Sequence, residues 1–368
     1  MIIESIELKN FRNYEGLEIC FSPSTNILYG ENARGKTNIL EAAYMSGTSK
    51  SHRGSRDKEI IRFSEEEAHI RTKVIKNEKN YQIDIHLKKN GRKGIAVNHV
   101  PLKRAADIFG ILNIIFFSPE DLAIIKSGPS ERRRFMDSEL CQIDKVYLNN
   151  LTNYNKVLSQ RNKLLKDIYF NPGSKSTLDV WDEQLVNYGK KIINTRRRFA
   201  SDIAPIVEKM HESISGGREK LVVTYEPDID DIFFYDELIR GREKDLKTGS
   251  TSVGPHRDDL EFLIDGVDIR KYGSQGQQRT CALSLKLSEI KLVEKVIDEK
   301  PVLLLDDVMS ELDSKRQNDL LSSLDDMQIL LSCTGVDEFI KNRFHIDKIF
   351  EIKDNSAIEM NGSILEDI

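Results

Sequence analysis

Three short stretches of the chain are mainly apolar, as expected of strands that are buried on both faces. They are residues 25–29, residues 113–117 and residues 301–307, and the last of them ends in two acids. Runs of this kind are typical of parallel sheets whose two faces are covered by helices. Residues 81–87 instead alternate apolar and polar positions, as a half-buried strand does, and residues 89–92 predict a hairpin turn after it. The pattern predicts an α/β protein.

The pattern changes to helical spacing from about residue 128. Pro129 suits the first turn of a helix, and apolar residues then recur three or four positions apart. Residues 171–174, Asn-Pro-Gly-Ser, interrupt this spacing, and a second long helical stretch runs from Leu178 to Phe199. Two long helices joined by a Pro-Gly break predict an antiparallel helical hairpin.

The chain then returns to a mixture of strands and helices. The elements predicted are a strand (221–225), a short helix (231–240), a hairpin (260–264 and 267–269 around a two-residue turn) and a long helix (279–298). That long helix leads directly into the apolar run that ends in two acids.

Composition adds little to this picture except by exclusion. The chain has 368 residues, enough for two or so domains, and no apolar run approaches the length of a membrane helix. Its start lacks the basic head and apolar core of a secretory signal, so a cytoplasmic protein is expected, with no membrane partner. The four cysteines are far apart and form no C-x-x-C pair, which argues against disulfides and against a zinc site.

The segment between the first apolar strand and the helix that follows it fits the pattern G-x-x-x-x-G-K-[ST]. Its residues are Gly30, Glu31, Asn32, Ala33, Arg34, Gly35, Lys36 and Thr37. A loop of this kind wraps phosphate oxygens with backbone N–H groups at the positive end of a helix. Lys36 is expected to reach the β- and γ-phosphates of ATP, and the Thr37 hydroxyl to bind Mg²⁺.

The two acids at the end of the third apolar run complete the expected nucleotide site. Asp306 stands at the carboxyl end of its strand, where ligands bind in open α/β sheets, and is the expected second ligand of Mg²⁺. The predicted helical hairpin lies between Lys36 and Asp306 in the sequence. We therefore expect residues 1–127 and 250–368 to form two halves of one ATPase head, with residues 128–249 as an inserted helical arm.

A glycine-rich turn stands just before the long helix. Residues 273–278, Gly-Ser-Gln-Gly-Gln-Gln, resemble the L-S-G-G-Q signature of ABC-type ATPases, with Ser274, Gly276 and Gln277 on matching positions. In those proteins the signature contacts the ATP that a second subunit holds, so one nucleotide joins two chains. Residues 310–313, Ser-Glu-Leu-Asp, resemble the D-loop of the same class, with Ser310 and Asp313 as its candidate site residues. The alternative reading of residues 273–278 is a turn that only caps the helix.

Together these segments resemble the RecF family, bacterial recombination and repair proteins related to the SMC family. The segments that carry the resemblance are residues 8–14 (LKNFRNY), 30–38, 252–260 (SVGPHRDDL), 273–279 and 304–308. The resemblance covers essentially the whole chain. It implies an ABC-type P-loop ATPase head, with a mixed sheet and flanking helices, that carries an inserted helical arm domain.

The resemblance also implies roles for single residues. Lys36, Asp306 and Asp307 would form the catalytic centre, with Asp307 where many ABC ATPases carry a catalytic Glu. Arg12 would lie near the nucleotide. Thr334 stands roughly where many ABC proteins have a switch His, and a Thr cannot act as an imidazole does. Because the Asp carboxylate lies one methylene closer to the backbone than that of Glu, slow ATP turnover is expected.

Basic residues are clustered although the net charge of the chain is −5. One group spans residues 50–58, and two Arg triplets follow at residues 132–134 and 196–198. The candidate DNA contacts are Arg53, Arg56, Lys58, Arg132 and Arg133. Three consecutive residues on a helix point in different directions, so some members of each triplet must pair inside the protein.

The function expected from this resemblance is ATP-dependent DNA binding in recombinational repair, with slow, DNA-stimulated ATP hydrolysis. ATP would close a homodimer on gapped or single-strand/double-strand DNA without sequence preference, and the protein would assist RecA loading and SOS induction with RecO and RecR. Three alternatives share parts of the pattern: a transporter nucleotide-binding subunit, a small-molecule phosphotransferase, and a scaffold that holds ATP only for structure.

Overall fold

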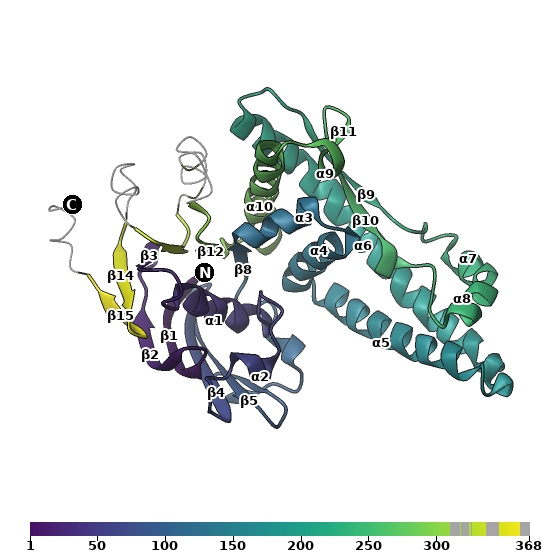
Figure 1. Cartoon of the computed structure of the whole chain (residues 1–368), viewed down its shortest axis with the longest axis horizontal. Coiled ribbons are helices and arrows are strands. Elements are labelled where there is room, and N and C mark those ends of the chain that lie inside the picture. The colour runs from purple at the N-terminus through teal and green to yellow at the C-terminus, as the bar shows by residue number, and fades with distance from the viewer. Residues whose placement is uncertain (310–316, 318–323, 325, 336–345, 361–368) are drawn as a thin grey trace. The chain divides into compact units, whose positions relative to one another are not determined.

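The chain folds into two compact units (Figure 1). The computed structural model describes residues 1–309, 317, 324, 326–335 and 346–360. The first unit, here the head unit, comprises Met1–Asp121 and Glu289–Ile368, and the second, the arm unit, comprises Leu122–Ser288. In the described parts of the chain, no helix combines the length and apolar character that crossing a bilayer would require.

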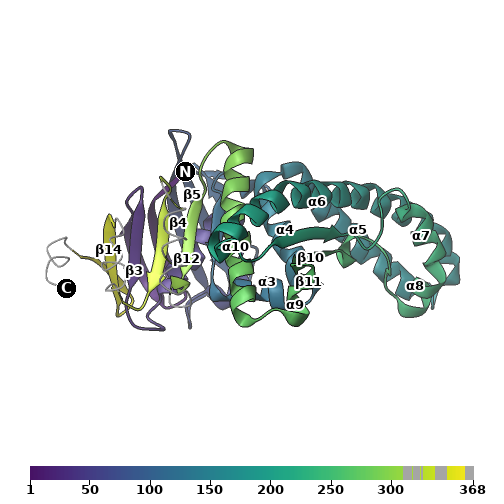
Figure 2. The same ribbon diagram turned by 90° about the horizontal axis from the view of Figure 1, so that it is seen from above.

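A largely parallel sheet forms the core of the head unit, and several of its strands can be followed in Figure 2. In spatial order its described strands are β15 (Ser356–Glu359), β14 (Lys348–Lys353), β3 (Thr25–Tyr29), β13 (Ile329–Cys333), β12 (Val302–Asp306) and β8 (Ile114–Phe117). All neighbours pair in parallel except β14 with β15. The three mainly apolar stretches thus form strands as expected, and the α/β fold is confirmed.

The head unit has a second, antiparallel sheet. Its described strands are, in spatial order, β2 (Tyr14–Cys20), β1 (Ile2–Phe11), β4 (Glu67–Lys76), β5 (Lys79–Lys88), β6 (Gly94–Val97) and β7 (Val100–Pro101). Burial alternates along β4 and in the second half of β5, so one face of each strand is packed and the other faces water. Helix α1 (Lys36–Thr48) contacts strands of both sheets, which places the end of the phosphate-loop segment at the centre of the head unit.

The arm unit is built on a long helical hairpin, as the sequence predicts. Helices α5 (Lys145–Asp167) and α6 (Leu178–Ser215) pack together across the short 3₁₀ turn Pro172–Thr177. A separate helix α4 (Pro129–Ile143) precedes α5, because Asp144 ends α4 and its side chain accepts hydrogen bonds from the first N–H groups of α5. The other described helices of the chain are α2 (Asp57–Ile60), α3 (Leu122–Lys126), α7 (Phe234–Arg240), α8 (Arg242–Thr248), α9 (Ile269–Tyr272) and α10 (Gln275–Ile297), with 3₁₀ turns at Ala105–Ile108, Pro119–Asp121 and Pro255–Arg257.

The arm unit extends further along the sequence than residue 249, where the sequence analysis ends the arm. Strand β10 (Asp259–Ile264) pairs with β9 (Leu221–Glu226) on one side and β11 (Val267–Asp268) on the other. These backbone hydrogen bonds tie residues after 250 to the arm. Helix α10 (Gln275–Ile297) then begins in the arm unit and ends in the head unit.

A fully buried arginine links the elements of the arm. The Arg161 guanidinium lies 2.5 Å from Asp182 Oδ1 and 2.7 Å from Asp245 Oδ2. It also donates to Thr251 Oγ1 at 2.8 Å. Because all three charged side chains are fully buried, each carboxylate is needed to offset the cost of removing the guanidinium from water.

Two neighbouring aspartates allow this network to be tested. Asp182 and Asp179 both pair with Arg242, but the Asp182 side chain is 0% exposed and that of Asp179 is 62% exposed. Asp182→Ala also leaves Arg161 with one buried carboxylate fewer, so we expect it to lower the free energy of unfolding by about 3–5 kcal/mol. Asp179→Ala should cost less than about 1 kcal/mol. Urea denaturation followed by circular dichroism measures both, and equal losses would contradict a structural role for the buried network.

Candidate nucleotide site

The phosphate loop lies between β3 and α1 and contains two glycines in conformations that other residues rarely adopt. Gly30 has φ +148° and Gly35 has φ +111°. A Cβ on Gly30 would lie 2.5 Å from the carbonyl oxygen of Ile352, and a Cβ on Gly35 would lie 2.6 Å from the hydroxyl of Tyr14. Neither position has room for a side chain, so the curve of the loop depends on both glycines.

Lys36 folds back over this loop. Its ammonium donates to the carbonyl oxygens of Gly30 at 2.6 Å and Glu31 at 3.0 Å, and the residue is only 3% exposed. The charge is thus fixed inside the ring that the loop backbone makes, where phosphate oxygens bind in loops of this type. On the outer side, Arg34 pairs with Glu31 at 2.5 Å, while Asn32 and Ala33 form the exposed tip.

Thr37, at the start of α1, and Asp306, at the end of β12, are joined by a hydrogen bond. The Thr37 hydroxyl, at the start of α1, donates to Asp306 Oδ1 at 2.8 Å, and Ser332 Oγ of β13 donates to the same oxygen at 2.6 Å. A hydroxyl and a carboxylate are hard oxygen ligands of the kind that Mg²⁺ takes beside nucleotide phosphates. The donor set therefore fits Mg²⁺, with Thr37 and Asp306 as the residues that would hold it. The sequence analysis did not identify Ser332, which interrupts the apolar run of β13.

Asp307 directly follows Asp306 in a left-handed conformation, with φ +51°. Its backbone N–H donates to Ser332 Oγ at 3.0 Å, which fixes the turn after β12. Burial raises the pKa of the Asp307 carboxyl, Lys36 opposes this increase, and the neighbouring Asp306 adds to it. A carboxylate whose pKa is raised accepts a proton more readily, as a general base requires.

Residues at the turn between β1 and β2 contact the phosphate loop and the start of α1. Asn13 donates to the carbonyl oxygen of Arg34 at 3.2 Å and accepts from the Asn38 side chain at 2.7 Å. Tyr14 is buried directly under Gly35. These contacts give the LKNFRNY segment a physical role, and the sequence analysis did not assign one to Asn13 or Tyr14.

Arg12 contacts α1 instead of the loop itself. Its guanidinium lies 2.8 Å and 2.6 Å from the two carboxylate oxygens of Glu41, and it also donates to Ser55 Oγ at 2.8 Å. Burial raises the pKa of Glu41, but the hydrogen bonds from Arg12 and Ser51 outweigh burial and hold that pKa below its ordinary value. Arg12 thus anchors the helix that carries Lys36 and Thr37.

The signature-like turn forms a helix cap in the arm unit. Ser274 Oγ accepts from the N–H of Gln277 at 3.2 Å, and the Gln277 side chain accepts from the N–H of Ser274 at 2.9 Å. This reciprocal pair is a capping box at the N-terminus of α10. Gly276 lies within the first turn of this helix. A Cβ on Gly273 would lie 2.5 Å from the carbonyl oxygen of Ile269, so this position has no room for the leucine of the L-S-G-G-Q pattern. The turn therefore caps α10, and contact with a nucleotide on a second chain stays a prediction.

Two further expectations concern the end of the chain. The D-loop residues Ser310 and Asp313 lie outside the described residues. Thr334 is exposed directly after β13, in the turn that follows Cys333.

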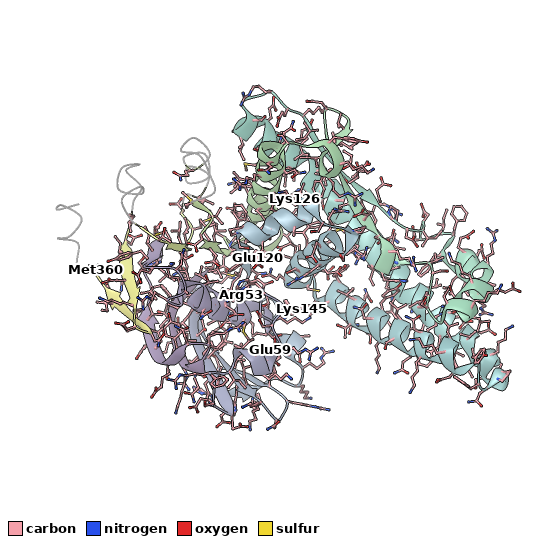
Figure 3. The ribbon with its side chains drawn as sticks, in the orientation of Figure 1. Arg53, Glu59, Glu120, Lys126, Lys145 and Met360 are labelled. Carbon is pink, nitrogen blue, oxygen red and sulfur yellow. The ribbon has the colours of Figure 1, made fainter. Side chains whose placement is uncertain are left out.

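The basic group after α1 lies on the surface of the head unit. Arg53, Arg56 and Lys58 are exposed, and Arg53 is labelled with the nearby Glu59 in Figure 3. Arg53 donates to Asn38 Oδ1 at 3.3 Å, beside Thr37 at the start of α1. A continuous set of contacts thus runs from Arg53 through Asn38 and Asn13 to the phosphate loop.

Arg132 and Arg133 require a correction. The Arg132 side chain is only 3% exposed and lies 2.5 Å from Asp259, so it pairs inside the arm and presents no free charge to DNA. Arg133 is half-buried and donates to the carbonyl oxygen of Asp258 at 2.7 Å. Arg196 of the other triplet is buried against Asp137 and Asp258. The expectation that members of both triplets pair internally is confirmed.

The chain is similar to known proteins over nearly its whole length. A family model described as RecF/RecN/SMC N terminal domain matches residues 2–355. The DNA replication and repair protein RecF of Agathobacter rectalis is 65% identical over 352 residues, 96% of this chain and 97% of that protein. A structure of the recombination mediator protein RecF with ATP in the RecFOR pathway superimposes with a TM-score of 0.89 at 38% identity, covering 98% of this chain and 99% of that one.

A more distant structure shares the fold alone. The Smc head domain of Pyrococcus furiosus, with an extended coiled coil, matches with a TM-score of 0.58 at 18% identity, covering 99% of this chain and 98% of that chain.

The close approach of Tyr14 to Gly35 generates a prediction. In Gly35→Ala the added methyl collides with Tyr14 and Asn13 in a strained conformation, so the loop must move. We expect at least tenfold weaker ATP binding, measured by calorimetry. Gly16→Ala is the matched control, since a Cβ there meets no atom within 4 Å, and it should bind as the parent protein does. Unchanged ATP affinity in Gly35→Ala would show that the loop can accommodate the methyl group.

Proposed function

The chain belongs to the RecF family of SMC-like, ABC-type ATPases, and from that premise we propose that it is an ATP-dependent DNA-binding protein of recombinational DNA repair and replication. The roles after which its relatives are named, DNA replication and repair and recombination mediation, support this proposal. So does the family match over nearly the whole chain, which disfavours a transporter subunit or a small-molecule phosphotransferase.

The hydrogen bond between Thr37 and Asp306 is the observation that carries the proposal. It joins the phosphate loop to the acidic strand end at 2.8 Å, so one site offers backbone N–H groups, an ammonium and two oxygen ligands together. ATP would bind along residues 30–37, and Mg²⁺ beside it would neutralise phosphate charge. Arg12 pairs with Glu41 of α1 and so helps to fix the position of this helix next to the loop.

The signature turn would act on the nucleotide of a second copy. Ser274, Gly276 and Gln277 stand at the N-terminus of a helix of 23 residues, where backbone N–H groups and the helix dipole favour an anion. In the proposed homodimer these groups face the γ-phosphate held by the partner's phosphate loop. ATP thereby becomes part of the interface, and its hydrolysis opens the dimer.

DNA would bind to the exposed basic group of the head unit, residues Arg53, Arg56 and Lys58. Contacts of this kind neutralise phosphates, so binding should be independent of sequence and should weaken as salt rises. The contact of Arg53 with Asn38 gives a short route by which the nucleotide site and this surface affect one another. Gapped or junction DNA, and cooperation with RecO and RecR in RecA loading and SOS induction, are the family roles that the proposal extends to this chain.

Hydrolysis would depend on Asp307 as the base that receives the proton of the attacking water. Its raised pKa favours proton acceptance, while its short side chain limits how well the water is positioned. We therefore propose a slow, DNA-stimulated ATPase suited to a switch.

Dimerisation is tested by light scattering after gel filtration, with and without ATP, Mg²⁺ and gapped DNA. We expect the parent protein to dimerise with ATP, Lys36→Ala to lose nucleotide binding, and Ser274→Arg to bind ATP yet remain monomeric. Lys79→Ala and Ser176→Arg are controls at exposed positions elsewhere and should behave as the parent does. A parent protein that binds ATP with Mg²⁺ but stays monomeric in every condition would refute the proposed switch.

Substitution of the proposed base separates binding from hydrolysis. Asp307→Asn keeps the size of the side chain but cannot take a proton, so we expect at least a hundredfold lower kcat with ATP binding and the dimer preserved. Asp326→Asn, at a position that is 94% exposed in the same unit, should leave kcat unchanged. Phosphate release at saturating ATP measures both, and near-normal turnover in Asp307→Asn would assign the base to another residue.

A further inference from the structure

Two histidines and a glutamate gather on the solvent face of the antiparallel sheet. His69 of β4 lies directly opposite His86 of β5 in the strand register, and Glu67 precedes His69 by two positions. Side chains two positions apart share a face of a strand, so all three point the same way. Strands β4 and β5 are neighbours in the sheet and lie side by side in Figure 1.

The three side chains also converge in distance. Glu67 Oε2 lies 2.7 Å from His86 Nε2, and the rings of His69 and His86 stack with centroids 4.1 Å apart and planes inclined by 19°. One ligand atom from each residue can be chosen so that all lie within 4.8 Å of one another. An ion pair between Glu67 and His86 would not by itself require the second imidazole to stack on the first.

We propose that Glu67, His69 and His86 form a binding site for a divalent transition metal ion of the Zn²⁺ type. Two imidazoles and one carboxylate are a ligand set that Zn²⁺ accepts, with the fourth position open to water or to a group from a partner. Zn–N and Zn–O bonds of about 2.0–2.1 Å put tetrahedral ligand atoms about 3.3 Å apart, so rotation of these surface side chains closes the site. The spacing of the cysteines in the sequence does not reveal this site, because its ligands are histidines and a carboxylate from two strands.

The charges around the site are mixed. Lys9 of β1 pairs in register with His69, and Arg71 and Lys88 flank the cluster on β4 and β5. Arg71 is engaged by Asp84 at 2.7 Å and by Glu7 at 3.2 Å, which offsets its charge. Burial and the nearby His86 lower the pKa of His69, and the nearby Glu67 opposes this decrease.

This site is chemically distinct from the nucleotide site. Thr37 and Asp306 offer only oxygen atoms, which suit Mg²⁺, whereas imidazole nitrogens favour Zn²⁺, Ni²⁺ and Cu²⁺. Because its ligands come from two adjacent strands, a bound ion would join β4 to β5 and stabilise the antiparallel sheet.

The experiment is a titration of the full chain, freed of metal and nucleotide, with Zn²⁺ followed by calorimetry. We expect one equivalent of Zn²⁺ to bind, and His69→Ala and His86→Ala each to weaken that binding at least tenfold. His99→Ala removes another exposed histidine of the same sheet region and should leave the affinity unchanged. Thr37→Ala should also leave it unchanged, since it alters the nucleotide site alone.

A second measurement keeps the proposal testable if a variant folds poorly. X-ray absorption at the zinc edge of the parent protein should show two imidazole nitrogens in the coordination shell with oxygen ligands beside them. The proposal is overturned if Zn²⁺ does not bind, if His69→Ala and His86→Ala bind as His99→Ala does, or if the absorption spectrum shows no imidazole.

Discussion

The hydrogen bond from Thr37 to Asp306 depends on the order of strands in the core sheet, and the nucleotide site depends on that bond. Parallel strands end at one edge, so β3 delivers the phosphate loop and β12 delivers the carboxylate on the same side. Strand β13 separates them, and its Ser332 bonds to Asp306 from the position between. Residues from opposite ends of the chain therefore form one site only when all three strands are in register.

Local patterns were enough to predict the elements that form this site. Short, mainly apolar stretches predicted β3, β8 and β12, and the glycine motif marked the loop, because in each case the decisive interactions lie within a few adjacent residues. The sequence analysis assigned no strand to Ile329–Cys333, although that segment is apolar in the same way, and therefore gave Ser332 no place in the site. Which strands are neighbours is set by packing between distant segments, and one local pattern does not contain that information.

The arm shows the same limit for boundaries. Helical spacing and a Pro-Gly break predict the hairpin of α5 and α6 correctly. The pairing of β10 with β9 joins segments on either side of residue 249, and only the formed sheet shows that residues 250–288 associate with the arm. The sequence also did not show which arginines are exposed. Arg132 is buried and pairs with Asp259 of a strand distant in the sequence, whereas Arg53 is exposed.

The contacts of Lys36 bear on how much this side chain adds to nucleotide affinity. Two backbone carbonyls already solvate the ammonium, so an arriving phosphate oxygen competes with them, and each hydrogen bond gained replaces one that existed before. A charged phosphate oxygen forms the stronger hydrogen bond with an ammonium than a neutral carbonyl does. The contribution of Lys36 is therefore the difference between these two interactions, which is smaller than the full attraction between ammonium and phosphate.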